Sequence, residues 1–171
     1  MFLIKTVAED QAEGKIKEAY SMFPSPLPVP APLKLMSASP ALFERQVGLI
    51  QYYMGHKTLS FPLLTAIRFI SSDECGHEFC LDFNRRLLMQ AGMTAEDLET
   101  MKADPATAPL EDKERSMLVF VAKALRAPKS IAQTDVDQLR TEGWTDSDIL
   151  DALAHGANMV ASAIMFNALK A

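Results

Sequence analysis

Apolar residues recur at three- and four-residue steps along most of the chain, which is the spacing of one face of an α-helix. Between Glu9 and Met22 the recurring positions are Ala12, Ile16, Ala19 and Tyr20. Similar spacing predicts helices at Pro40 to His56, Ser60 to Ile70, Glu74 to Ala91, Glu111 to Leu125, Ser130 to Glu142 and Ile149 to Leu169. No alternating strand pattern of useful length is present. The sequence therefore predicts an all-α fold of about seven to eight helices.

Capping residues set several of these boundaries. Ser60 is a suitable N-cap, and Pro62 falls in the first helical turn, where proline is tolerated. The polar run Ser71 to Asp73 is expected to interrupt the pattern and separate two helices. Gly92 is expected to end the second of them, because glycine readily adopts the left-handed conformation of a C-cap.

Two segments resemble each other and predict an internal repeat. GMTAEDL, at 92–98, matches GWTDSDI, at 143–149. In each, a glycine ends one helix and a threonine caps the next, with an aspartate three residues after the threonine as in a capping box. We expect a helix-turn-helix unit that is used twice.

The segment from about 24 to 32 carries five prolines within FPSPLPVPAP, so it is expected to be an extended connector. Leu27 and Val29 alternate with the prolines, which favours a connector that wraps against the domain. A chain of 171 residues is about the size of one domain, so we expect a single domain over 1–171.

Composition narrows the possible partners. The net charge is −5, and no basic run is longer than Arg85-Arg86, so nucleic acid is not expected to bind. The apolar C-terminal stretch contains Asp151, His155 and Asn158, which favours a buried helix over a membrane span. With two cysteines and no secretory signal, we expect a cytoplasmic protein whose thiols are free.

One stretch, Asp73 to Asn84, carries candidate chemistry. On a helix, His77, Cys80 and Asn84 share one face because they are spaced by three and four residues. An imidazole next to a thiol can accept its proton or, as a cation, favour the thiolate, which is the reactive form. Five residues along an ideal helix separate Cα atoms by about 8.6 Å, too far for a disulfide. Cys75 and Cys80 can therefore pair only if Cys75 lies ahead of the helix.

This pattern resembles the carboxymuconolactone decarboxylase and AhpD-like alkylhydroperoxidase superfamily. HEFCLDFN is close to that superfamily's Cys-x-aromatic-Cys followed by a histidine four residues later. The resemblance extends from the first helix to Asn167 and takes in the proline-rich entry, the Gly-x-Thr-x-x-Asp turn and a final helix rich in small residues. It implies an AhpD-like fold and a homo-oligomer, either a dimer, a trimer or a hexamer. The stretch Ala152 to Ala163 permits close helix approach at such an interface.

The chain departs from the superfamily's peroxidase pattern at three positions. The first cysteine is replaced by His77, the relay histidine by Asn84, and the relay glutamate falls near Thr65, while Cys80 is retained. Asparagine cannot act as an acid or base. The usual cycle closes a disulfide between attacking and resolving thiols, so here Cys75 or an external thiol would have to resolve the oxidised Cys80.

Three functional hypotheses follow. The first is a thiol-dependent, peroxidase-like oxidoreductase that uses Cys80 with assistance from His77. The second is a non-enzymatic binding or scaffold protein that has lost the relay. The third is decarboxylase- or isomerase-like chemistry on a small carboxylate with His77 as acid or base. Neither a cofactor nor a metal site is expected, because Cys75, His77 and Cys80 do not converge on a helix and no second ligand motif is present.

Overall fold

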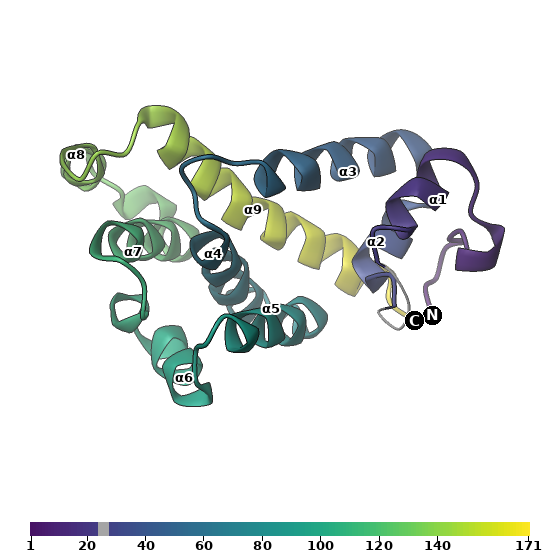
Figure 1. Cartoon of the computed structure of the whole chain (residues 1–171), viewed down its shortest axis with the longest axis horizontal. Coiled ribbons are helices and arrows are strands. Elements are labelled where there is room, and N and C mark those ends of the chain that lie inside the picture. The colour runs from purple at the N-terminus through teal and green to yellow at the C-terminus, as the bar shows by residue number, and fades with distance from the viewer. Residues whose placement is uncertain (24–27) are drawn as a thin grey trace. The chain divides into compact units, whose positions relative to one another are not determined.

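A computed structural model describes residues 1–23 and 28–171 (Figure 1). The chain divides into two compact units. Unit 1 contains Met1–His56 with Ile164–Ala171, and unit 2 contains Lys57–Ala163. The expectation of a single domain stays a prediction.

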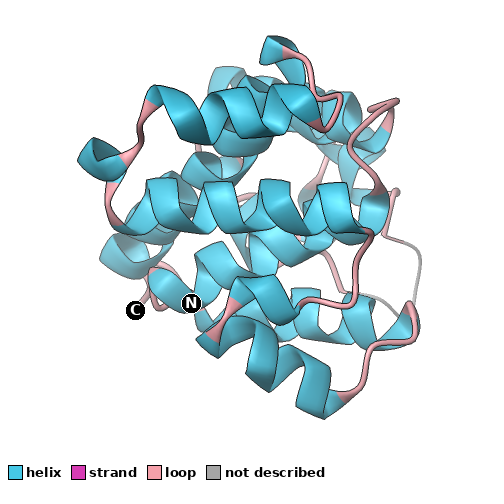
Figure 2. Cartoon of the chain, turned by 90° about the vertical axis from the view of Figure 1, so that its left-hand side faces the viewer, coloured by secondary structure: helices cyan, strands magenta, loops and turns pink. Residues whose placement is uncertain are grey.

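The predicted all-α fold is confirmed, and in the described residues helices are joined by loops without any strand (Figure 2). There are nine α-helices in this part of the chain, one or two more than expected. They are α1 (Gly14–Tyr20), α2 (Ala31–Met36), α3 (Pro40–Met54), α4 (Phe61–Glu74), α5 (Glu78–Gln90), α6 (Ala95–Ala103), α7 (Asp112–Arg126), α8 (Gln133–Thr141) and α9 (Asp146–Leu169). Three single-turn 3-10 helices lie at Glu9–Gln11, Pro105–Thr107 and Pro128–Ser130.

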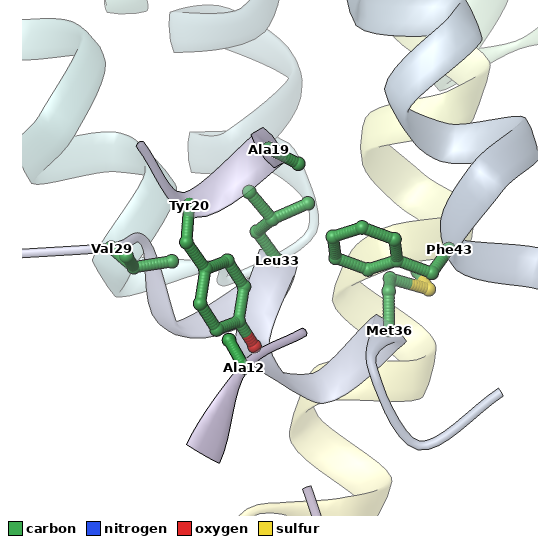
Figure 3. Packing of buried hydrophobic residues seen from close by; sticks show 7 residues of the cluster. All are labelled: Ala12, Ala19, Tyr20, Val29, Leu33, Met36 and Phe43. Carbon is green, nitrogen blue, oxygen red and sulfur yellow. The ribbon is translucent and has the colours of Figure 1, made fainter. Parts of the chain in front are cut away.

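Unit 1 is built around a cluster contributed by α1, α2, α3 and the segments next to them (Figure 3). The rings of Tyr20 and Phe43 meet edge to face with centroids 6.0 Å apart, and the Tyr20 hydroxyl donates to the carbonyl of Val7 at 3.1 Å. The two chain ends also meet here, because the amide of Leu3 donates to the carbonyl of Leu169 at 2.8 Å. The buried members of the cluster are Ala12, Ala19, Tyr20, Val29, Leu33, Met36 and Phe43.

The proline-rich connector is shorter than expected. Residues 24–27, including Leu27, lie outside the described residues, whereas Val29 is buried in the cluster of unit 1. Pro30 precedes α2 and Pro32 falls in its first turn. This helix was not predicted, because a dense run of prolines indicates an extended chain. Proline is nevertheless compatible with the first turn, where its missing N–H is not needed.

In unit 2, α4 packs against both α5 and α7 (Figure 1). Its start at Ser60 is confirmed, since the Ser60 hydroxyl accepts from the amide of Leu63 at 3.2 Å. The predicted break at Ser71 to Asp73 is wrong, because α4 continues to Glu74. Ser71 and Ser72 donate their hydroxyls at 2.6 Å to the carbonyls of the preceding turn, which satisfies both groups within the helix.

Both copies of the predicted helix-turn-helix unit adopt the expected turn. Gly92 and Gly143 have φ values of +101° and +91°, in the left-handed region that favours glycine. The amides of Asp97 and Asp148 donate to the hydroxyls of Thr94 and Thr145, each at 3.1 Å. In return, the two aspartate carboxylates accept hydrogen bonds from the threonine amides. These are capping boxes at the starts of α6 and α9.

Helix α9 is less buried than expected. Among the described helices it alone is long and apolar enough to span a bilayer, which is weak evidence because core helices of water-soluble proteins meet the same criterion. Only 33% of its most apolar window is buried by this chain. Within unit 2 its buried positions include Ala152, His155 and Gly156. Small residues here therefore already serve contacts inside the unit.

Gly156 is the closest of these contacts and gives the first prediction. A Cβ at this position would lie 2.9 Å from Val121 Cγ1 and 3.2 Å from Leu125 Cδ1 and Ser71 Oγ. Gly156→Leu is expected to lower the free energy of unfolding by about 3 kcal/mol, because the neighbouring helices must move apart. Urea unfolding followed by circular dichroism measures this change. Ala157→Leu, at the exposed neighbouring position, is the matched control, and equal midpoints for both variants would contradict close packing at Gly156.

Candidate functional site

The turn between α4 and α5 places the candidate cysteine. Cys75 is the C-cap of α4, Gly76 adopts a positive φ of +64°, and His77 is the N-cap of α5. The predicted start of this helix at Glu74 is therefore wrong, since the left-handed Gly76 separates two helices. The amide of His77 donates to the carbonyl of Ser72 at 2.8 Å, which folds the turn back on the end of α4.

This turn brings His77 and Cys80 into contact. His77 Nε2 lies 3.3 Å from Cys80 Sγ, within hydrogen-bonding distance for sulfur. The two residues are 0% and 9% exposed, so the cysteine retains a small accessible surface while the histidine has none. Of the two residues, only Cys80 therefore retains any solvent-accessible surface.

Arg68, which sequence reasoning missed, is the centre of the polar cluster beside this pair. Its Nε donates to Asn84 Oδ1 at 2.8 Å, and one terminal nitrogen donates to Thr65 Oγ1 at 2.8 Å. The other terminal nitrogen lies 3.1 Å from His155 Nε2. The guanidinium thus joins α4, α5 and α9 within unit 2.

The chemistry of arginine fixes the state of its partners. A guanidinium has only donors, so His155 Nε2 must accept, which makes His155 a neutral imidazole with its proton on Nδ1. The same rule fixes the orientation of the Asn84 side-chain amide. Its oxygen accepts from Arg68, and its nitrogen donates to the carbonyl of Cys80 at 2.7 Å. Arg68 is therefore surrounded by uncharged acceptors: a hydroxyl, an amide and an imidazole.

Burial disfavours the charged forms of both Cys80 and Arg68. Desolvation raises the pKa of the Cys80 thiol to about 12, the nearby Cys75 also raises it, and the positive charge of Arg68 acts in the opposite direction. Desolvation lowers the pKa of Arg68 to about 10, although the electrostatic interaction with Cys80 raises it. At neutral pH the pair is a charged guanidinium and a protonated thiol.

Cys75 is separate from this contact. It is half-buried, and its thiol donates to the carbonyl of Ser72 with Sγ 3.8 Å from the oxygen. Burial raises its pKa, although hydrogen bonds to backbone groups oppose the change. Both cysteines are free thiols. Because Cys75 precedes α5, the separation calculated for an ideal helix does not apply, and a resolving role for Cys75 stays a prediction.

Thr65 and His155 show how much of the cluster the sequence revealed. Thr65 is fully buried in α4, accepts from Arg68 and donates to the carbonyl of Phe61 at 2.7 Å. Arg68 lies one turn beyond it on the same helix, and this spacing was the available signal. His155, which the sequence places on a predicted buried helix, lies 87 residues from Arg68 along the chain. Within residues 1–23 and 28–171, no group of three or more His, Cys, Asp or Glu side chains is arranged to hold a metal ion.

Comparison with known proteins identifies the architecture. No family model and no curated protein matches the chain. A solved structure described as the alkylhydroperoxidase AhpD core, an uncharacterized peroxidase-related protein from Ralstonia eutropha JMP134, superposes with a TM-score of 0.81. The match covers 98% of this chain and 90% of that one at 18% identity. This chain has an AhpD-like fold.

A second solved structure also matches the chain. An uncharacterized peroxidase-related protein from Silicibacter sp. TM1040 matches with a TM-score of 0.75 and 22% identity, over 95% of this chain and 88% of its own. At these identities the likeness shows the AhpD-like fold and not the activity.

The bridging role of Asn84 gives the second prediction. Asn84→Leu would leave Arg68 Nε and the carbonyl of Cys80 without their present partner. We expect the free energy of unfolding to fall by about 2–3 kcal/mol, because one lost hydrogen bond involves a charged group. Urea unfolding measures it, with Asn158→Leu on an exposed position of α9 as control. A loss no larger than that of the control would show that the cluster is not structurally important.

The raised pKa of Cys80 gives the third prediction. The rate of alkylation by iodoacetamide follows the thiolate fraction, so in a Cys75→Ser background it should rise about tenfold per pH unit from pH 7 to pH 10 without a plateau. Mass spectrometry of the labelled chain over this range measures the rate. A plateau near pH 7 would show that His77 and Arg68 together overcome the effect of burial.

Proposed function

We propose that this protein performs single-cysteine thiol chemistry at Cys80, with His77 as the proton acceptor, and that it reduces a hydroperoxide. The observation that supports the proposal is the 3.3 Å contact between His77 Nε2 and Cys80 Sγ, next to the cationic Arg68. His77 stands where the resembled pattern has a cysteine, so the contact replaces a pair of thiols by a thiol and a base.

The reaction balances with one protein thiol. His77 accepts the proton of Cys80, and the thiolate attacks the distal oxygen of the hydroperoxide, so that an S–O bond forms and the O–O bond breaks. The departing alkoxide takes the proton from His77 and leaves as an alcohol, while Cys80 becomes a sulfenic acid. Two equivalents of an external thiol then return Cys80 to the thiol, releasing water and a disulfide.

Arg68 supports this cycle electrostatically. Its positive charge favours the thiolate of Cys80 against the penalty of burial. Because its hydrogen bonds hold Asn84, and Asn84 holds the carbonyl of Cys80, it also fixes the turn of α5 that carries the sulfur. The external thiol reductant, a homo-oligomeric state and a cytoplasmic location belong to the same proposal.

A second candidate is a non-enzymatic binding or scaffold protein. The raised pKa of Cys80, to about 12, favours this reading because very little thiolate exists at neutral pH. The third hypothesis, acid or base chemistry on a small carboxylate through His77, has less support, since His77 is fully buried.

The fourth prediction separates these candidates. With cumene hydroperoxide and excess dithiothreitol, the wild type should turn over, and Cys80→Ser should lose activity completely because the attacking sulfur is gone. His77→Gln, which keeps the size of the side chain and removes the base, should lower kcat about 10²-fold or more at pH 7. An assay of hydroperoxide consumption measures both.

Cys75→Ser is the matched control. It should leave the first oxidation of Cys80 unchanged, as detected by dimedone labelling of the sulfenic acid. Absence of turnover and of labelling in the wild type would contradict the peroxidase proposal and favour a non-enzymatic binding protein. Activity that survives Cys80→Ser but is lost in His77→Gln would favour chemistry through His77 instead.

A further inference from the structure

Unit 2 contains a pocket of about 440 Å³ that does not include Cys80 or any residue bonded to Arg68. It lies between the start of α4, the Gly92 turn that joins α5 to α6, and the segment leading into α7. This volume is within the range of small-molecule sites. Part of its wall is apolar and is formed by Pro62, Met93 and Leu110.

The charged groups of the pocket are all acidic. Among the described residues that line it, Asp97, Glu111 and Glu114 carry carboxylates, and none is lysine, arginine or histidine. Asp97 is occupied in the capping box of α6, where it accepts from Thr94. The two basic residues next to Glu114 in the sequence have other partners. Lys113 Nζ lies over the ring of Trp144, 5.1 Å from its centroid, and Arg115 donates to Asp112 and to the carbonyls of Ala108 and Leu110.

Glu114 is the unusual member of this group. It is only 9% exposed, yet in the part of the chain that the structure describes its side chain has neither a hydrogen bond nor an ion pair. It stands three residues after Glu111, the N-cap of α7, but α7 has no side-chain capping bond. Its oxygens are not fully enclosed, so they keep access to the pocket that the residue lines.

The physical chemistry of such a carboxylate indicates what would bind. Buried polar groups normally have partners, and a carboxylate without one at the wall of a pocket is stabilised by an opposite charge. A metal ion would need three or more ligands close together, and no such group occurs among the described residues. An ammonium on a hydrocarbon chain needs only one carboxylate and an apolar wall.

We propose that this pocket binds a small aliphatic amine, with its ammonium on Glu114 and its hydrocarbon against Pro62, Met93 and Leu110. In a diamine, the second ammonium would face Glu111. The site is independent of the thiol chemistry at Cys80, and the proposal holds whether or not the protein reduces hydroperoxides.

Titration calorimetry at low ionic strength tests the site with 1-aminobutane and 1,4-diaminobutane as probes. 1-Butanol, which has the same chain without the charge, should bind at least tenfold more weakly. Glu114→Gln keeps the shape of the side chain and should weaken amine binding at least tenfold. Glu96→Gln, which removes an equal charge from an exposed position of α6 outside the pocket, should bind within twofold of the wild type.

A second variant covers the case in which Glu114→Gln does not fold. Met93→Trp fills the pocket without changing its charge, and it should abolish binding while circular dichroism shows a folded protein. The proposal is overturned if neither amine binds the wild type at millimolar concentrations, if 1-butanol binds as well as 1-aminobutane, or if Glu114→Gln or Met93→Trp binds the amine like the wild type.

Discussion

The guanidinium of Arg68 is the constraint on which the candidate site depends. A partly buried positive charge is expensive unless hydrogen bonds replace its lost hydration, and here Thr65, Asn84 and His155 supply them. Each partner comes from a different turn or helix, so the requirement to satisfy one cation fixes the relative positions of α4, α5 and the first half of α9 within unit 2.

Two of the substitutions relative to the resembled peroxidase pattern provide hydrogen-bond acceptors for Arg68. Threonine and asparagine stand where the pattern has an acid and a histidine, and both accept hydrogen bonds from Arg68. A carboxylate at position 65 would form an ion pair with Arg68 and reduce the field that this cation exerts on Cys80. The neutral acceptors leave the positive charge of Arg68 uncompensated at short range.

The helices and their caps could be predicted because their signals are local. Ser60, Thr94 and the left-handed glycines act within four residues of the boundaries that they set. Local reasoning failed where two signals competed: the serines at 71 and 72 bond within α4, and the prolines of α2 fit its first turn. The pairing of His77 with Cys80 followed from spacing, whereas the bond between Arg68 and His155 joins residues 87 apart and has no local signature.

The donor character of Arg68 also limits how protons travel. Conduction along a chain of hydrogen bonds requires every link to reverse its direction, giving a proton on one side as it receives one on the other. Arg68 can only donate hydrogen bonds. Its bonds to Thr65, Asn84 and His155 therefore cannot reverse their direction. A proton leaving Cys80 has no exit through them, whereas the imidazole of His77, 3.3 Å from the sulfur, can accept it.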